Sequence, residues 1–150
     1  MIHFFKEYFE YNYFFNQKIL QFLQENQNNF SDRSLSLISH IVNVHAIWNN
    51  KLKPSGNTVG SWEVLSLEQC RQLDKDNYDR SLWLLEEIEL NQVIEYTSGK
   101  GNVFHHKAAD LMFQIVNHST YHRGQLATEF RQSGFEPFLT DFIYYKMIQS

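Results

Sequence analysis

Four long segments of this chain repeat their apolar residues at every third or fourth position, and that periodicity constrains the fold more than any other feature. Such spacing is typical of amphipathic helices, and only two prolines and six glycines are available to interrupt them. We expect helices at about residues 2–25, 32–52, 67–88 and 107–132. Ser31 is a suitable N-cap for the second helix, and Ser133-Gly134 is a suitable end for the fourth.

The region between the third and fourth helical segments follows a different pattern. Residues 93–97 and 102–105 are β-prone and flank a glycine-containing turn, which predicts a small β-hairpin. The aromatic tail, residues 138–148, is expected to pack back as a short helical segment. The connection between the second and third helices is longer than a tight turn requires, which favours a crossover. The sequence therefore predicts an all-α four-helix bundle with a crossover connection, forming one domain over residues 1–150.

Charge and composition exclude several classes of function. The net charge is -4 and no cluster of five Lys or Arg residues occurs, so we expect no nucleic-acid partner. The longest uncharged stretch, Ser34–Asn50, is too short and too polar to span a bilayer, and the N-terminus does not resemble a signal peptide. Cys70, the single cysteine, cannot form an internal disulfide and is expected to be structural. A cytoplasmic protein without a membrane partner is the prediction.

His118 and His122 are the most suggestive pair of side chains. Four residues apart on one helix, they share a face and continue the apolar line of Leu111 and Ile115. That spacing suits two imidazoles that bind one divalent ion. The competing interpretation is a chance pair, with one histidine hydrogen-bonded beside the core. Gly124, inside the same helix, costs about 1 kcal/mol relative to alanine and suggests a close approach to another helix.

A third ligand should come from a facing helix, because metal sites in bundles are built from side chains on facing helices. The second helix offers His40 and His45, which are five residues apart and point away from each other. His45 lies nearer the apolar stripe of this helix, but helical periodicity does not choose between the two.

The chain resembles the DinB family (DinB/YfiT-like metalloenzymes), which is unrelated to the DNA polymerase of the same name. Four stretches carry the resemblance in the same order along nearly the whole chain. They are residues 11–20 with a Tyr-Asn pair, 37–48 with a His eight positions before a Trp, 117–125, and a closing segment of 134–137 followed by 141–145. Residues 117–125, Asn-His-Ser-Thr-Tyr-His-Arg-Gly-Gln, are the most specific, whereas residues 54–88 carry little of the likeness.

The resemblance implies a four-helix bundle with a crossover and a ligand set of His40, His118 and His122. In the family the metal-binding His of the second helix lies eight residues before the Trp, which is Trp48 here. His45 falls where many relatives have an acidic residue. The alternatives for it are a hydrogen bond to a metal ligand, a contact with the substrate, and a plain surface position.

Three neutral imidazoles leave a divalent ion with an open position, which is typical of catalytic rather than structural sites. The resemblance implies a metal-dependent thiol S-transferase or hydrolase with bound Zn²⁺ or Ni²⁺, acting on a small molecule such as a low-molecular-weight thiol. It also favours a homodimer. The alternatives are a non-catalytic, metal- or ligand-binding stress-response bundle, and a bundle whose histidines hold no ion. No catalytic residue beyond the three ligands is predicted.

Overall fold

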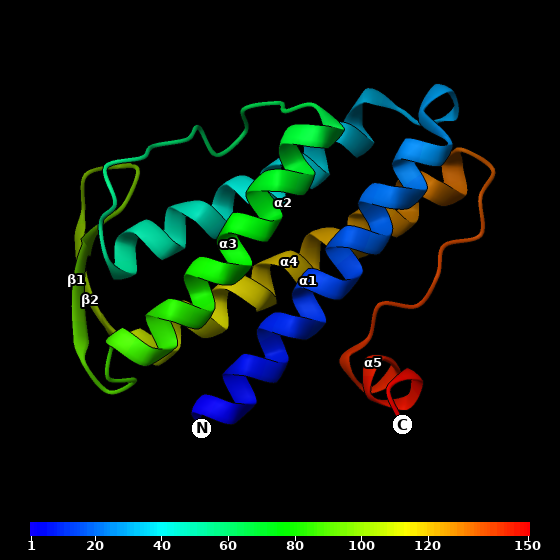
Figure 1. The fold of residues 1–150 in the computed structure, drawn as a ribbon. Coiled ribbons are helices and arrows are strands. Elements are labelled where there is room, and N and C mark those ends of the chain that lie inside the picture. Colours follow the sequence, from blue (N-terminus) through cyan, green and yellow to red (C-terminus); the bar gives the residue numbers. More distant parts are fainter.

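The computed structural model describes residues 1–150 and confirms the all-α prediction (Figure 1). Its elements in chain order are α1 (Ile2–Glu25), the 3-10 turn η1 (Gln27–Asn29), α2 (Asp32–Leu52), α3 (Leu67–Glu87), β1 (Val93–Thr97), β2 (Val103–Lys107), α4 (Ala108–Gln132) and α5 (Phe142–Ile148). The four expected helices are present, with α3 ending and α4 beginning one residue from the expected positions. The expected hairpin is present as the antiparallel pair β1–β2.

Local hydrogen bonds explain where these helices begin and end. The Ser31 hydroxyl accepts a hydrogen bond from the Ser34 backbone N–H at the start of α2, as the sequence predicts. At the start of α3, Ser66 and Gln69 form a reciprocal capping box, which satisfies two backbone donors that would otherwise lack partners. Gly134 ends α4 with a φ of +86°, a conformation that glycine adopts without steric cost.

The helices are arranged so that α1 packs on α3 and α4, while α2 packs on the same two helices from the other side. Segment 53–66 runs back along the bundle, so that α2 and α3 start at the same end and run parallel (Figure 1). Side-chain contacts give the same direction, because Ser39 lies beside Cys70 and His45 beside Ser81. The connection between α2 and α3 is therefore the crossover that its length suggested.

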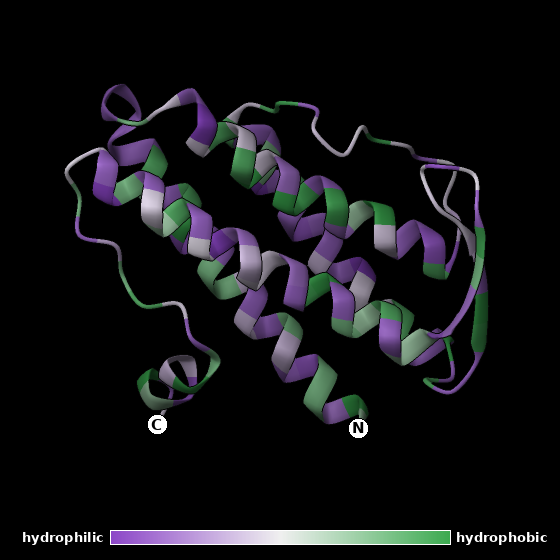
Figure 2. Ribbon diagram, turned by 180° about the vertical axis from the view of Figure 1, so that it is seen from behind, coloured by the Kyte–Doolittle hydropathy of each residue, from purple (hydrophilic) through white to green (hydrophobic).

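The core consists of apolar faces that alternate with polar ones along every long helix (Figure 2). Aromatic rings of α1 dominate one end of it, among them Phe5, Phe9 and Phe15. The short helix α5 covers these rings by packing Tyr145 against Phe15, with ring centroids 6.4 Å apart. The expectation that the aromatic tail packs back as a helix is confirmed. None of the helices combines the length and the apolar character needed to cross a bilayer.

A buried polar layer joins α4 to α1. The Arg123 side chain is 2% exposed, and its guanidinium donates to Asn12 Oδ1 at 2.6 Å, Asn16 Oδ1 at 3.2 Å and the Tyr11 hydroxyl at 2.8 Å. Asn16 in turn donates to a carboxylate of α3, Asp74, at 2.8 Å. These bonds compensate for the burial of a charge that would otherwise be strongly unfavourable.

Gly124 does not mark a close approach between helices, so that interpretation is wrong. A Cβ built at this position has no heavy atom within 4 Å, and the residue is exposed on α4. The glycine neither relieves a steric clash nor adopts a positive φ.

Candidate metal centre

Three histidine rings meet between α2 and α4. His40 of α2 lies against His118 and His122 of α4, and one ring nitrogen of each lies within 4.8 Å of the other two. The ring centroids are 4.9 Å apart for His40 and His118, 4.6 Å for His40 and His122, and 4.4 Å for His118 and His122. The Nε2 atoms of His118 and His122 are 3.0 Å apart. His40 and His122 are buried, whereas His118 is half-buried.

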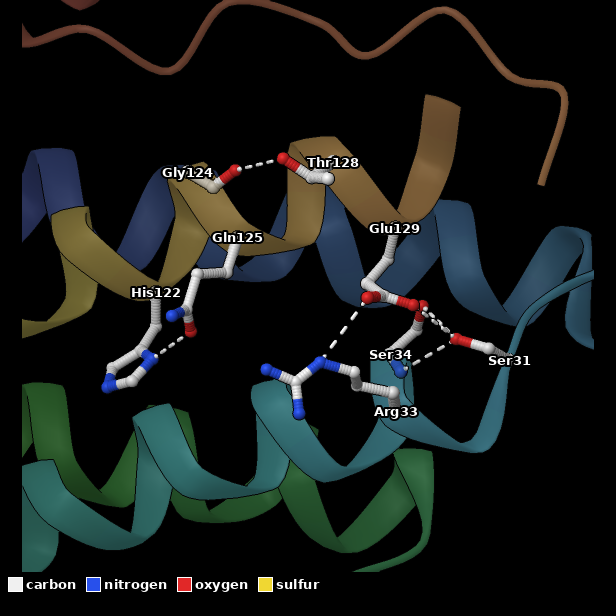
Figure 3. Close-up of polar contacts among 8 residues, drawn as sticks. All are labelled: Ser31, Arg33, Ser34, His122, Gly124, Gln125, Thr128 and Glu129. Atoms are coloured by element: carbon white, nitrogen blue, oxygen red, sulfur yellow. Dashed lines mark hydrogen bonds and ion pairs between the residues drawn. The ribbon is translucent and has the colours of Figure 1, made fainter. Parts of the chain in front are cut away.

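Hydrogen bonds at Nδ1 orient two of these rings. His40 donates its Nδ1–H to the carbonyl of Ser61 at 2.7 Å, and His122 donates its Nδ1–H to Gln125 Oε1 at 2.7 Å (Figure 3). A histidine that donates from Nδ1 keeps the Nε2 lone pair free, and such partners fix the tautomer and orientation of metal-binding histidines. The Nδ1 atom of His118 is buried without a hydrogen-bond partner.

The crossover segment forms one wall of the cluster. The Trp62 ring stacks on His40 with centroids 3.6 Å apart and planes 7° apart, while 52% of the residue stays exposed. The segment is fastened to α2, because Asn43 donates to the carbonyl of Glu63 at 2.7 Å and the Leu65 backbone N–H donates to the Ser39 hydroxyl at 3.0 Å. Trp62 is therefore held over the histidines by these two bonds, which follow it in sequence, and by the bond from His40 to the Ser61 carbonyl, which precedes it.

Burial keeps His40 and His118 in the protonation state that metal binding needs. It lowers the pKa of His118 to about 4, with the neighbouring charges of His122 and His40 adding to the effect. Burial also lowers the pKa of His40, against the opposing effect of its hydrogen bond to Ser61. Both imidazoles are consequently neutral near pH 7, and neutral imidazole is the form that binds a metal ion.

The donor set and its geometry fit a divalent ion. With Zn–N bonds of about 2.0–2.1 Å, the nitrogens of a tetrahedral site lie about 3.3 Å apart. The 3.0 Å separation of His118 Nε2 and His122 Nε2 is close to this value, and the third nitrogen lies within 4.8 Å. Three neutral nitrogens leave one tetrahedral position for another ligand.

His45 belongs to a different environment, and the idea that it is a surface histidine is wrong. It is 3% exposed, lies between α2 and α3, and stacks on Phe9 with centroids 6.0 Å apart. Its Nε2 lies 2.7 Å from the Ser81 hydroxyl, which itself donates to Asn49 Oδ1 at 3.0 Å. Burial lowers the pKa of His45 to about 3. The residue is not part of the three-histidine cluster.

Two other histidines and the single cysteine lie outside the cluster. His105 and His106 are exposed on β2, where they contact Glu95 and the Tyr96 hydroxyl. Cys70 is buried in the core and its thiol lies 3.5 Å from the Ser39 hydroxyl. Burial raises the pKa of this thiol, so the residue is structural rather than nucleophilic.

Three residues that support the cluster were not predicted from the sequence: Ser61, Trp62 and Gln125. Gln125 left a detectable signal, because a side chain three residues after His122 lies on the same face of a helix. Ser61 and Trp62 left none. Their position depends on how the crossover segment folds back onto α2, which no local pattern encodes.

The fold and the cluster together define a class: a crossover four-helix bundle with three histidines, contributed by two antiparallel helices, that could hold a metal ion. The chain belongs to the DinB family, whose model matches residues 1–149. It is also 22% identical over 157 residues to the protein DinB of Bacillus subtilis (strain 168), a comparison that covers 91% of this chain and 90% of that protein. No solved structure matched.

Proposed function

We propose that this protein binds a divalent transition-metal ion, Zn²⁺ or Ni²⁺, through His40, His118 and His122 and uses its open position in thiol transfer or hydrolysis. The observation that carries the proposal is the convergence of three imidazoles from two helices, two of them oriented by hydrogen bonds at Nδ1.

The three ligands and their supports have separable roles. A bound ion with one open position would act as a Lewis acid, able to activate water or to hold a thiolate sulfur. His40, His118 and His122 would hold it, while Gln125 and the Ser61 carbonyl would keep two of the rings in the binding tautomer. Trp62 would shield one side of the site from solvent. Membership of the DinB family supports this assignment.

Metal content tests the ligand set. The protein and its His118→Ala variant are stripped with a chelator, incubated with Zn²⁺ or Ni²⁺, and analysed by elemental mass spectrometry after gel filtration. We expect one ion per chain in the wild type and a loss of at least tenfold in affinity in the variant. His105→Ala, an exposed histidine outside the cluster, is the matched control. Equal metal uptake by both variants would refute the ligand assignment.

Cobalt spectroscopy tests the reaction class. Co²⁺ takes the geometry of Zn²⁺ but absorbs visible light, and a thiolate that binds it adds a charge-transfer band. We expect small thiols to shift the spectrum of the Co²⁺-loaded protein. If no thiol alters the spectrum, the thiol-transfer part of the proposal is wrong, whereas metal binding by the bundle is unaffected.

We further propose that the chain forms a homodimer through apolar side chains left uncovered by the bundle. Ile2 and Phe4 of α1 and Phe113 of α4 are each exposed, and the Phe4 and Phe113 rings both stack on Tyr8. Such neighbouring apolar side chains are typical of contact surfaces. Sedimentation equilibrium tests this homodimer. We expect a dimer for the wild type and a monomer for a Phe4→Ser, Phe113→Ser double variant. A monomeric wild type would contradict the proposal.

A further inference from the structure

Beyond the histidines, the seam between α2 and α4 holds a fixed arginine. Arg33 precedes His40 by seven residues and Glu129 follows His122 by seven, so the Arg33–Glu129 pair lies two helical turns, or about 10 Å, along from the cluster. Arg33 Nε lies 3.3 Å from Glu129 Oε1, and the Ser31 hydroxyl donates to Glu129 Oε2 at 2.8 Å (Figure 3). Both carboxylate oxygens are therefore engaged.

The pairing leaves the other edge of the guanidinium free. Glu129 has a side chain that is only 14% exposed, and it holds Arg33 by Nε alone. The two terminal nitrogens of Arg33 have no hydrogen bond in the protein, and in Figure 3 one of them points along the seam toward Gln125 and His122 while the other points toward α2. With 59% of its side chain exposed, Arg33 is accessible to a ligand. This free edge can bind a carboxylate through two parallel hydrogen bonds.

Gln125 lies between the arginine and the histidines. Its Oε1 accepts the hydrogen bond from His122, whereas its side-chain nitrogen has no partner in the protein. The free polar groups of these two side chains are thus the Gln125 amide nitrogen and the terminal nitrogens of Arg33, all of them hydrogen-bond donors. A row of donors beside a metal-binding cluster suits a ligand that carries acceptors or a negative charge.

We propose that Arg33 and Gln125 form an anion-binding subsite beside the three histidines, which holds the carboxylate of a small acid whose other end carries the metal-binding group. The inference rests on the proposed metal site and deepens it. The substrate class is a thiol acid, or another acid with a metal-binding end, in which several methylene groups separate the two ends. Glu129 is a positioning residue that holds Arg33 for this contact.

The test compares two thiols of equal length in the Co²⁺-loaded protein. Mercaptohexanoate carries a carboxylate and mercaptohexanol a neutral alcohol at the far end. We expect the acid to bind about threefold to fivefold more tightly, the range for a partly exposed charge pair. Arg33→Gln should remove this preference and leave the affinity for mercaptohexanol unchanged. Arg131→Gln, which removes an equal charge from an exposed position on α4, should keep the preference.

Three results would overturn the subsite. They are equal affinities for the two thiols in the wild type, an unchanged preference in Arg33→Gln, or an equal loss in Arg131→Gln. If neither thiol alters the cobalt spectrum, the thiol chemistry proposed above fails by itself. The comparison is then made with hydroxamic acids, which bind metals through oxygen, carrying either a carboxylate or an alcohol at the far end. Equal affinities for that pair overturn the subsite independently.

Discussion

The buried histidine His45 gives a stability prediction whose size follows from its hydrogen bonds. The Ser81 hydroxyl gives its proton to Asn49 Oδ1, so His45 must donate from Nε2 to Ser81. The remaining ring nitrogen, Nδ1, is buried and has no partner. Burial away from water disfavours the charged ring and lowers the pKa of His45 to about 3, and protonation would also leave the Nδ1–H without an acceptor.

A depressed pKa makes folding less favourable as the pH falls. The unfolded chain binds a proton at His45 below about pH 6.5, whereas the folded protein does not until about pH 3. The contribution of neutral His45 to the free energy of unfolding is therefore at its full value above about pH 6.5 and is lost progressively as the pH falls toward 3. At about pH 5 the loss is about 2 kcal/mol, since 1.5 pH units correspond to about 1.4 kcal/mol each.

The His45→Gln variant isolates this effect. Glutamine can donate to Ser81 as the imidazole does but cannot be protonated. Urea denaturation is measured with a chelator present, at about pH 7.5 and about pH 5, for both proteins. We expect the variant to be the less stable at the higher pH and to gain about 2 kcal/mol relative to the wild type at the lower one. Because His40 and His118 titrate in both proteins, their contributions cancel. A stability difference that is the same at both pH values would refute the assignment of a neutral, buried His45.

Three further predictions concern α4 and the crossover segment. Gly124→Ala should raise the free energy of unfolding by up to about 1 kcal/mol, because the helix interior has open space for a Cβ; thermal denaturation measures it, and a destabilised variant would contradict it. Gln125→Leu should weaken Zn²⁺ binding by about tenfold to a hundredfold in a chelator competition, since His122 loses its orienting partner; unchanged affinity would count against the site. Ni²⁺ or Co²⁺ should quench the fluorescence of Trp62, which is stacked on His40, and Trp62→Phe should abolish that part of the quenching; a quenching that persists undiminished in the variant would show that the metal lies elsewhere.

The helices and the His118/His122 pair were predictable because both depend on residues close together in sequence. Apolar periodicity set the helix bounds to within one residue, and a spacing of four placed the two rings on one face. Helical periodicity could not decide whether His40 or His45 lies with the His118/His122 pair. Both are buried, but α2 has two packed faces: His45 points toward α3 and His40 toward α4. An apolar stripe shows which residues are interior, not which neighbour they meet.

The supports of the site depend on tertiary structure. The Ser61 carbonyl and Trp62 reach His40 only because segment 53–66 folds back along the bundle. Gly124 misled for a related reason, since a glycine in a helix indicates a close contact only when another element approaches it, and none does. The single-domain organisation, the cytoplasmic location and the homodimer stay predictions.

The adjacent residues His122 and Arg123, about 100° apart around the helix axis, constrain α4 through contacts with two different helices. His122 reaches across to His40 of α2, while Arg123 reaches into the side chains of α1. If α4 rotated about its axis or shifted along it to improve the contact with His40, it would break the hydrogen bonds of Arg123 to α1. The two sets of contacts therefore fix the rotation and the axial position of α4 together. Any ion bound by His118 and His122 would therefore lie beside a helix whose position is fixed by Arg123, a residue that points toward α1 and not toward the ion. The distances among the three histidines therefore depend on the hydrogen bonds of the buried Arg123, which lie on another face of the same helix.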